Sequence, residues 1–202
     1  MRGKIIYHSM PEQIEAKLRN DILTGRLKPG DPLREKEISQ SFGVSRGPVR
    51  EVFRQLTQQG LLTAIPNKGV RVSTRPSLEL RPLVAELRLK IELFVLNDIF
   101  HKITEDDLAL WEEILEDIRI ACEANDAAAL VGHDLAFHQA IIQSHDDQDV
   151  FALWQPIVLR MLMHYSRLGD LMESYLEHKR ILDAIRNGDK EGALAALAKN
   201  IQ

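Results

Sequence analysis

Apolar side chains recur three and four positions apart along most of the chain, which is the spacing of one face of an α-helix. The first such run places Ile14, Leu18 and Ile22 on one face. Ser9 precedes this run as a helix cap, and Gly25 follows it as a helix stop. We therefore expect a first helix between these two residues.

Two short helices and a pair of extended runs follow the first helix. The pattern predicts helices near residues 35–42 and 45–60, separated by a turn at Gly43. The extended runs at residues 61–65 and 70–73 flank a basic tip that contains glycine, and they indicate a β-hairpin. Helix, turn, helix and hairpin in this order predict a winged helix-turn-helix.

A proline-containing linker near Arg75 is followed by segments with helical periodicity only. The first of them carries a predicted apolar stripe at Leu80, Val84, Leu87, Ile91, Val95 and Ile99. Helices are predicted near residues 80–99, 107–123, 126–144, 147–168, 171–187 and 189–201. The predicted fold class is mainly α, with a winged helix-turn-helix in residues 1–75 and an all-helical bundle of about six helices in residues 76–202.

The charge distribution divides the chain at the same place. The formal net charge is −4, but residues 1–75 carry 14 Lys and Arg against 7 Asp and Glu, and the rest carries 12 against 23. A basic head on an acidic body suits a protein of which only one end approaches phosphates. The sequence has no apolar run long enough for a membrane span and no secretory signal pattern, so we expect a cytoplasmic protein without a membrane partner. The single cysteine, Cys122, excludes an internal disulfide and a cysteine-based metal cluster.

The basic end concentrates DNA-binding groups at the start of its third helix. Arginines at the N-terminal end of a helix in the major groove can form bidentate hydrogen bonds to guanine. Gly47 has no side chain and so permits close approach of the backbone to the duplex. Arg34 and the hairpin tip would extend the contact to the DNA backbone or the minor groove. The predicted contacts to double-stranded DNA are Arg34, Ser45, Arg46, Gly47, Arg50, Lys68 and Gly69.

Three ionisable residues lie on otherwise apolar faces in the helical half, namely Asp134, His138 and His178. Asp134 and His138 are four residues apart and therefore lie on one helix face. A carboxylate and two imidazoles that face a bundle interior suit a divalent metal such as zinc, nickel or manganese, because burying them is costly without a partner or an ion. Each of them alone could also be a hydrogen-bonded core residue.

The N-terminal half resembles the GntR-type transcription regulators. The resemblance rests on Leu-Lys-Pro-Gly-Asp-Pro-Leu-Arg-Glu at residues 27–35, on Phe-Gly-Val-Ser-Arg-Gly-Pro-Val-Arg-Glu at residues 42–51 and on Gly-Leu-Leu at residues 60–62. It covers roughly residues 10–73. It implies a sequence-specific DNA-binding regulator, more commonly a repressor that its ligand releases, in which the seven residues named above contact the operator.

The helical half resembles the effector domain of the FadR/VanR branch of that family, the FCD domain, at residues 134–138 and 177–185. This resemblance implies a divalent metal held by the aspartate and the two histidines, together with one further histidine on the last helix. Here Asn200 stands at the place of that histidine. Asparagine is a weak ligand for zinc-like ions, so metal binding is either weakened here or replaced by a direct polar contact to the effector.

The resemblance also implies an effector site beside the metal, for a small organic acid such as a carboxylate or sugar acid. In related domains an arginine of the first long helix meets the effector carboxylate, and Arg88 matches its position. Arg160 is a second candidate, and either arginine could instead be a solvated or salt-bridged surface residue. We expect a homodimer whose basic heads read a short inverted repeat, with effector binding changing their spacing.

Two other functions are alternatives to a transcription regulator. His133-Asp134 and His145-Asp146 are His-Asp dyads, which metal-dependent helical phosphohydrolases use, so such an enzyme is the alternative. Both dyads belong to one short segment, whereas such enzymes draw metal ligands from several helices, and we find no nucleophile and no phosphate-binding glycine loop. A DNA-binding protein without a sensor leaves the three inward ionisable residues unexplained. The sequence therefore favours a ligand-sensing regulator that is not an enzyme.

Overall fold

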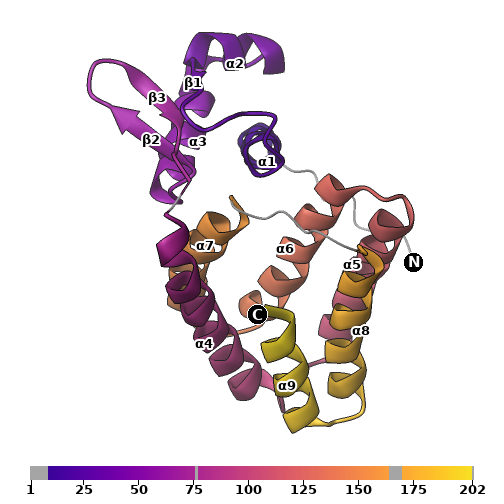
Figure 1. Cartoon of the computed structure of the whole chain (residues 1–202). Helices are drawn as coiled ribbons and strands as arrows, with labels where there is room; N and C mark the ends of the chain where they lie inside the picture. Colours follow the sequence, from indigo (N-terminus) through magenta and orange to yellow (C-terminus); the bar gives the residue numbers. More distant parts are fainter. Residues whose placement is uncertain (1–8, 76, 164–169, 202) are drawn as a thin grey trace. The chain divides into compact units, whose positions relative to one another are not determined.

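The computed structural model describes residues 9–75, 77–163 and 170–201 (Figure 1). The chain divides into two compact units, residues 1–75 and 76–202. Each unit has its own set of buried apolar side chains, as independent domains do.

The described part of the first unit, residues 9–75, consists of three helices and a small sheet. Its elements are α1 (Met10–Leu23), β1 (Pro32–Leu33), α2 (Glu35–Phe42), α3 (Arg46–Gln58), β2 (Leu62–Ile65) and β3 (Gly69–Val72). At the start of α1 the backbone N–H of Ser9 donates to the Glu12 carboxylate at 2.7 Å, which satisfies a donor at the helix end. α1 packs against α3, and their buried faces supply much of the core, with Ile14, Leu18, Ile22, Val49, Val52, Phe53 and Leu56.

The three strands form an antiparallel sheet in the order β1-β3-β2. β2 and β3 are joined as a hairpin in which Ile65 pairs with Gly69. The hairpin turn requires positive φ angles at Asn67 (61°) and Gly69 (80°), a region that favours asparagine and glycine. This hairpin is the wing, and the predicted winged helix-turn-helix is confirmed.

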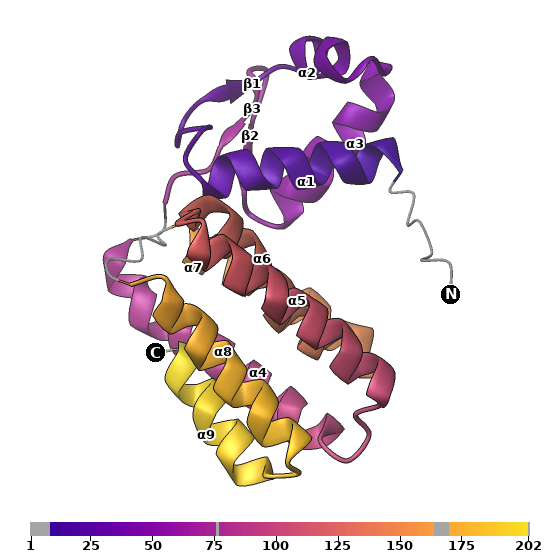
Figure 2. The ribbon, with the colours of Figure 1, turned by 90° about the vertical axis from the view of Figure 1, so that its right-hand side faces the viewer.

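The second unit is a helical bundle. Within its described residues it contains a short 3-10 helix, η1 (Leu78–Leu80), followed by α4 (Arg81–Ile99), α5 (Glu105–Glu123), α6 (Ala127–Gln143), α7 (Gln148–Leu162), α8 (Met172–Arg186) and α9 (Lys190–Ile201). α8 packs along α5 and α9, α5 along α6, and α4 along α7 and α9 (Figure 2). The predicted six-helix bundle is confirmed. The helix predicted over 147–168 ends at Leu162, and residues 164–168 of that prediction lie outside the described part of the chain.

None of the helices in the described ranges is both long enough and apolar enough to cross a membrane.

The apolar stripe predicted on α4 is wrong in its first half. Leu80 and Leu87 are exposed at 49% and 41%. The face that α4 buries instead consists of Arg88, Glu92, Val95, Leu96 and Ile99. Two charged side chains occupy core positions at the start of this face because they bind each other and further groups inside the bundle.

Candidate functional site

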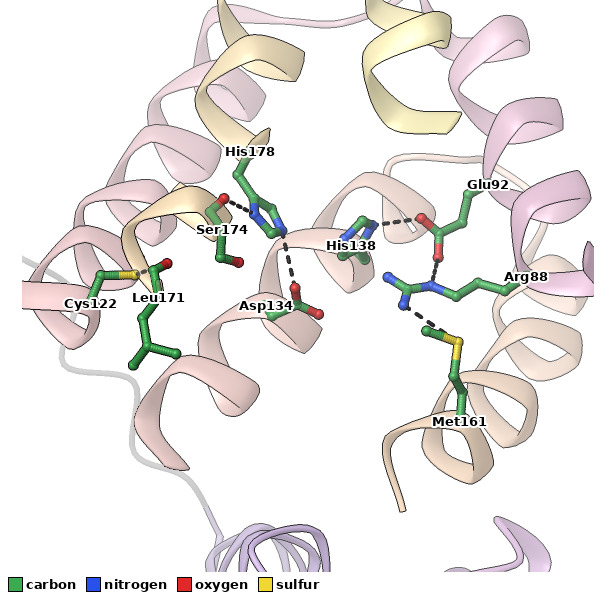
Figure 3. Close-up of polar contacts among 9 residues, drawn as sticks. All are labelled: Arg88, Glu92, Cys122, Asp134, His138, Met161, Leu171, Ser174 and His178. Atoms are coloured by element: carbon green, nitrogen blue, oxygen red, sulfur yellow. Dashed lines mark hydrogen bonds and ion pairs between the residues drawn. The ribbon is translucent and has the colours of Figure 1, made fainter. Parts of the chain in front are cut away.

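Three residues on two helices of the second unit meet inside the bundle (Figure 3). Asp134 and His138 lie on successive turns of α6, and His178 comes from α8. One ligand atom of each residue lies within 4.8 Å of those of the other two, and all three residues are buried. The structure thus brings together the three residues that the sequence predicts as metal ligands.

His178 is oriented by its own helix. Its Nδ1 atom lies 2.8 Å from the backbone carbonyl oxygen of Ser174, one turn earlier on α8. A carbonyl oxygen only accepts hydrogen bonds, so Nδ1 carries the proton and Nε2 presents a lone pair in the neutral ring. Nε2 lies 3.3 Å from a carboxylate oxygen of Asp134. Two acceptors therefore face each other across this short distance.

His138 is oriented by another helix. Its Nδ1 atom lies 2.6 Å from Oε2 of Glu92 on α4. Because a carboxylate accepts, Nδ1 donates and Nε2 is again the nitrogen with a lone pair. Burial lowers the pKa of His138, and the attraction of Glu92 offsets only part of that effect. The ring is therefore held in the neutral form, which is the form that binds metals.

Glu92 is a central residue of the site that the sequence did not single out. Its Oε1 atom accepts hydrogen bonds from Nε of Arg88 at 2.7 Å and from Nε1 of Trp154 at 2.7 Å, while Oε2 accepts from His138. The residue is only 1% exposed. Burial by itself would raise the pKa of Glu92, but Arg88 and His138 lower it to about 2. The carboxylate is therefore ionised at neutral pH and is held by donors from three helices.

Asp134 is also ionised. Burial acts to raise the pKa of its carboxyl group, but a proton on the facing Nε2 of His178 would lower it, and the charge of Arg88 lowers it further below the ordinary value. The cluster thus combines a buried carboxylate with two imidazoles. Phe137 packs edge-on against both imidazoles, with ring centroids 5.9 Å from His138 and 4.9 Å from His178, which restrains the tilt of the two rings.

The atoms of this cluster fit a divalent metal. Nε2 of His138 and Nε2 of His178 are buried and, among the described residues, have no hydrogen-bond partner. Buried polar atoms in proteins are nearly always paired. Two imidazole nitrogens beside a carboxylate form a donor set that zinc, nickel and manganese accept. The three residues are therefore the ones that could hold such an ion.

The remaining residues predicted for the second unit differ in their positions. Arg88 is 3% exposed and joins the cluster through Glu92. Arg160 is exposed near the end of α7, so the structure brings Arg88 and not Arg160 to the cluster. Asn200 is half-buried in the last turn of α9, and its role as a ligand stays a prediction.

The first unit presents a second candidate site at the start of α3. Ser45 caps this helix, and Arg46, Gly47 and Arg50 follow it with exposed side chains or backbone. α3 buries its opposite face and has no acidic residue in its first turn. The positive end of the helix dipole is therefore open to a phosphate group.

Gly47 is not needed for packing against any of the residues that the structure describes. A side chain added there would meet only the Ser45 hydroxyl, at 4.0 Å. The lack of a side chain thus matters only for something that approaches from outside, which agrees with a backbone that comes close to DNA. At the wing, Lys68 and Gly69 are exposed at the tip of the hairpin.

Two of the predicted DNA-binding arginines form exposed ion pairs. Arg50 donates from Nε and Nη2 to the two carboxylate oxygens of Glu35 at 3.0 and 2.9 Å. Arg34 donates to Glu37 at 3.1 Å. Both arginine side chains are 72% exposed. Exposed ion pairs contribute little to stability, so these arginines can exchange a carboxylate for a phosphate at low cost.

Known proteins with similar sequences and structures are bacterial regulators. Residues 11–72 match the family model described as bacterial regulatory proteins of the gntR family, and residues 83–202 match the FCD domain. The HTH-type transcriptional repressor RspR of Escherichia coli K12 is 31% identical over 195 residues, covering 95% of this chain and 85% of its own length. A probable D-xylose utilization operon transcriptional repressor of Paenarthrobacter nicotinovorans is 29% identical, covering 90% of this chain and 80% of its own.

The solved structure of E. coli McbR/YncC aligns with a TM-score of 0.80 at 26% identity, covering 96% of this chain and 94% of that one. These comparisons give no support to the phosphohydrolase alternative. The matched family consists of bacterial regulatory proteins, and the relatives are described as transcriptional repressors. The helix-turn-helix implies binding to an operator in DNA. The chain belongs to the gntR family of bacterial regulatory proteins, and it is a transcription regulator with an FCD domain.

Proposed function

We propose that the protein is a ligand-controlled repressor, in which residues 1–75 bind the operator and residues 76–202 bind a small organic acid and form a homodimer. The observation that carries the proposal is the 3.3 Å approach of Nε2 of His178 to the carboxylate of Asp134. Two buried acceptors at this distance repel each other unless a proton or a cation lies between them. The interior of the bundle is therefore suited to a positively charged occupant.

Asp134, His138 and His178 would hold this occupant as a divalent metal ion, with zinc, nickel and manganese as the candidates. Three protein ligands leave coordination positions open, as sites that bind further ligands do. Asn200 is either a weak fourth ligand or a polar contact to the effector. When bound, the metal supplies a positive charge to which the carboxylate of an effector can attach.

The proposed effector is a small carboxylate or sugar acid. Arg88 supports this class, because its guanidinium group lies buried beside the cluster and its Nε bond to Glu92 fixes its orientation. A guanidinium group recognises a carboxylate through hydrogen bonds and charge. Arg160 stays a second candidate for the effector contact. One relative is described as a probable repressor of a D-xylose utilization operon, so a neutral sugar is the competing class of effector.

On the DNA side, the proposed contacts are those at the start of α3 and at the wing. Arg46 and Arg50 would reach guanines in the major groove, and Ser45 and Gly47 would approach phosphates. Arg34, together with Lys68 and Gly69 of the wing, would bind the backbone or the minor groove.

The homodimer is supported by an exposed apolar face on α4. Leu83, Leu87 and Phe94 are 52%, 41% and 57% exposed, and Leu80, just before α4, is 49% exposed. A row of large apolar side chains that stays exposed marks an interaction surface. A second copy of the chain is the expected partner, because two-fold symmetry matches an inverted repeat. The charge change Leu83→Glu should convert a dimer to a monomer in light scattering, and an unchanged dimer mass would place the interface elsewhere.

The metal and effector sites can be tested by thermal unfolding of protein stripped of metal with a chelator. Zinc, nickel or manganese should raise the melting temperature, and gluconate, lactate or citrate should raise it further only when the metal is present. A ligand at about 100 times its Kd adds about 2.7 kcal/mol of stability. D-xylose serves as the neutral comparison. Stabilisation by the sugar alone would replace the organic acid with a neutral effector.

A matched pair of histidine variants identifies the ligands. His138→Ala should lose the metal-dependent stabilisation and the bound metal in elemental analysis. His133→Ala is the control, because His133 lies on the same helix, is 37% exposed and faces Asp117 at 3.8 Å instead of the cluster. Full metal content in His138→Ala would show that the ligands are wrong.

A further inference from the structure

The tautomer of a histidine decides whether it can bind a metal through Nε2. In the Nδ1–H form Nε2 has a lone pair, and in the Nε2–H form it does not. His138 can bind an ion between itself, Asp134 and His178 only in the first form, because it is Nε2 that lacks a partner while Nδ1 faces Glu92. The group that sets this tautomer therefore controls the site.

We propose that Glu92 is the positioning residue of this site, and that it fixes His138 in the Nδ1–H form with Nε2 directed at Asp134 and His178. This inference rests on the proposed metal site. A carboxylate at 2.6 Å from Nδ1 can only accept, so the proton must lie on Nδ1. The same contact fixes the rotation of the ring about its own axis.

Glu92 is suited to this role because it cannot turn away. Arg88 and Trp154 both donate to its Oε1 atom, each at 2.7 Å, which leaves Oε2 aimed at His138. The three donors come from α4, α7 and α6, and Glu92 is 1% exposed. The carboxylate thus connects the arginine proposed for the effector to a histidine proposed for the metal.

The substitution Glu92→Gln keeps the shape of the side chain but replaces the oxygen that accepts from His138 with an NH₂ group that donates. The amide oxygen must stay with Arg88 and Trp154, since an amide NH₂ group there would face two donors. The NH₂ group then faces Nδ1 of His138 and donates to it. His138 must become an acceptor at Nδ1 and carry its proton on Nε2, which removes the lone pair that a metal needs.

The experiment compares wild type, Glu92→Gln and Glu86→Gln. Glu86 lies on the same helix, pairs with Lys90 at 2.9 Å and is 59% exposed, so it matches the change in charge without touching the cluster. Zn²⁺ affinity is measured by competition with a chromogenic chelator. We expect Glu92→Gln to bind Zn²⁺ about 10- to 100-fold more weakly, and Glu86→Gln to bind as wild type does. A folded Glu92→Gln protein with wild-type affinity would overturn the proposal.

A second measurement tests the tautomer of His138 in the wild-type protein itself. In metal-free wild type, ¹⁵N–¹H correlation of the imidazole rings, assigned with His138→Gln, should show His138 protonated at Nδ1, and Glu92→Gln should move the proton to Nε2. An Nε2–H form in the wild type would refute the role of Glu92. If the wild type binds no Zn²⁺ but holds His138 as Nδ1–H, the proposed metal site fails and the assignment of the tautomer stands.

Discussion

The two candidate sites hold their charged groups in opposite ways. At the start of α3, Arg50 and Glu35 form a bidentate ion pair whose arginine is 72% exposed. In the bundle, Arg88 and Glu92 form an ion pair whose side chains are 3% and 2% exposed. The first pair is exposed to water and the second lies in the protein interior, although both join an arginine guanidinium group to a glutamate carboxylate.

This difference determines what each site can exchange. An exposed arginine gives up a carboxylate for a DNA phosphate with little change in solvation, and salt screens both states. A buried charge that loses its partner is costly, commonly by several kcal/mol. The DNA face is therefore suited to reversible binding that salt weakens, whereas the bundle cluster is suited to binding a defined ion and ligand in a fixed geometry.

The largest effect should come from removing a proposed metal ligand. His178→Ala removes one of two imidazole nitrogens that have no partner among the described residues, and we expect Zn²⁺ affinity to fall by more than the about 10- to 100-fold that loss of a hydrogen-bond partner of a ligand costs. Operator affinity of the metal-free protein should stay unchanged, because the change lies in the other unit. Calorimetric titration and a mobility-shift assay measure the two properties. His101→Ala, an exposed histidine of the same unit, is the control, and equal affinities in both variants would contradict the site.

The next largest effect should come from the recognition helix. Arg46→Ala should weaken specific operator binding by about 1–3 kcal/mol, or about 5- to 150-fold, and relax the preference for one base pair. Arg26→Ala makes the same charge change on the same unit, at a 63% exposed side chain outside α3 and the wing. Mobility-shift titrations with the operator and with a scrambled duplex measure both affinity and specificity. An equal loss in the two variants would reduce Arg46 to a general phosphate contact.

The local elements could be predicted because their signals are local. The capping contact of Ser9 with Glu12, the positive φ of Gly43 after α2 and the cap of Asp126 at α6 each involve residues within a few positions. The pair Asp134 and His138 was found in the same way, since residues four apart share a helix face.

Glu92 could not be found in this way, because its role depends on contacts between helices. Glu86 with Lys90 and Arg88 with Glu92 are both oppositely charged pairs at a spacing of four, yet the first pair is exposed at 59% and 71% and the second is buried. Only the packing of α4 against α6 and α7 distinguishes them. It brings in partners that lie 46 and 62 residues away.

A smaller effect on DNA binding should show whether Lys68 contacts the DNA backbone or recognises bases. Lys68→Ala at the wing tip should weaken binding about equally for operator and unrelated DNA, and should reduce the salt slope of binding by about 1. Lys17→Ala, on α1 and paired with Asp21 at 2.6 Å, is the matched control. Fluorescence anisotropy at a series of salt concentrations measures the slope. A loss confined to the operator would instead make Lys68 a base contact.

The smallest effect is expected at Asp107, a half-buried carboxylate. Its exposure lies between that of the exposed ion pairs of the DNA face and that of the buried ion pair in the bundle. Asp107 accepts hydrogen bonds from the backbone and hydroxyl of Thr104 at 2.9 and 2.7 Å and from Ser144 at 3.3 Å. The bonds from Thr104, followed by that from Ser144, lower the pKa of Asp107 in the folded protein. Its stabilisation is therefore complete above the pKa of the unfolded chain, about 4, and is lost as the pH falls through the lower folded value.

Asp107→Asn should accordingly reduce the free energy of unfolding by about 0.5–1.5 kcal/mol at pH 7, the net contribution of a typical hydrogen bond, because Asp107 accepts hydrogen bonds as a carboxylate. The gap to wild type should begin to close as the pH falls below about 4, and it should close fully only below the lower pKa of the folded protein, where the wild-type side chain is neutral as well. Urea unfolding at pH 7, 5 and 3.5 measures the gap, with Asp106→Asn, an exposed neighbour in the same turn, as the control. A gap that stays constant with pH would assign the effect to shape and packing and not to the charge of the carboxylate.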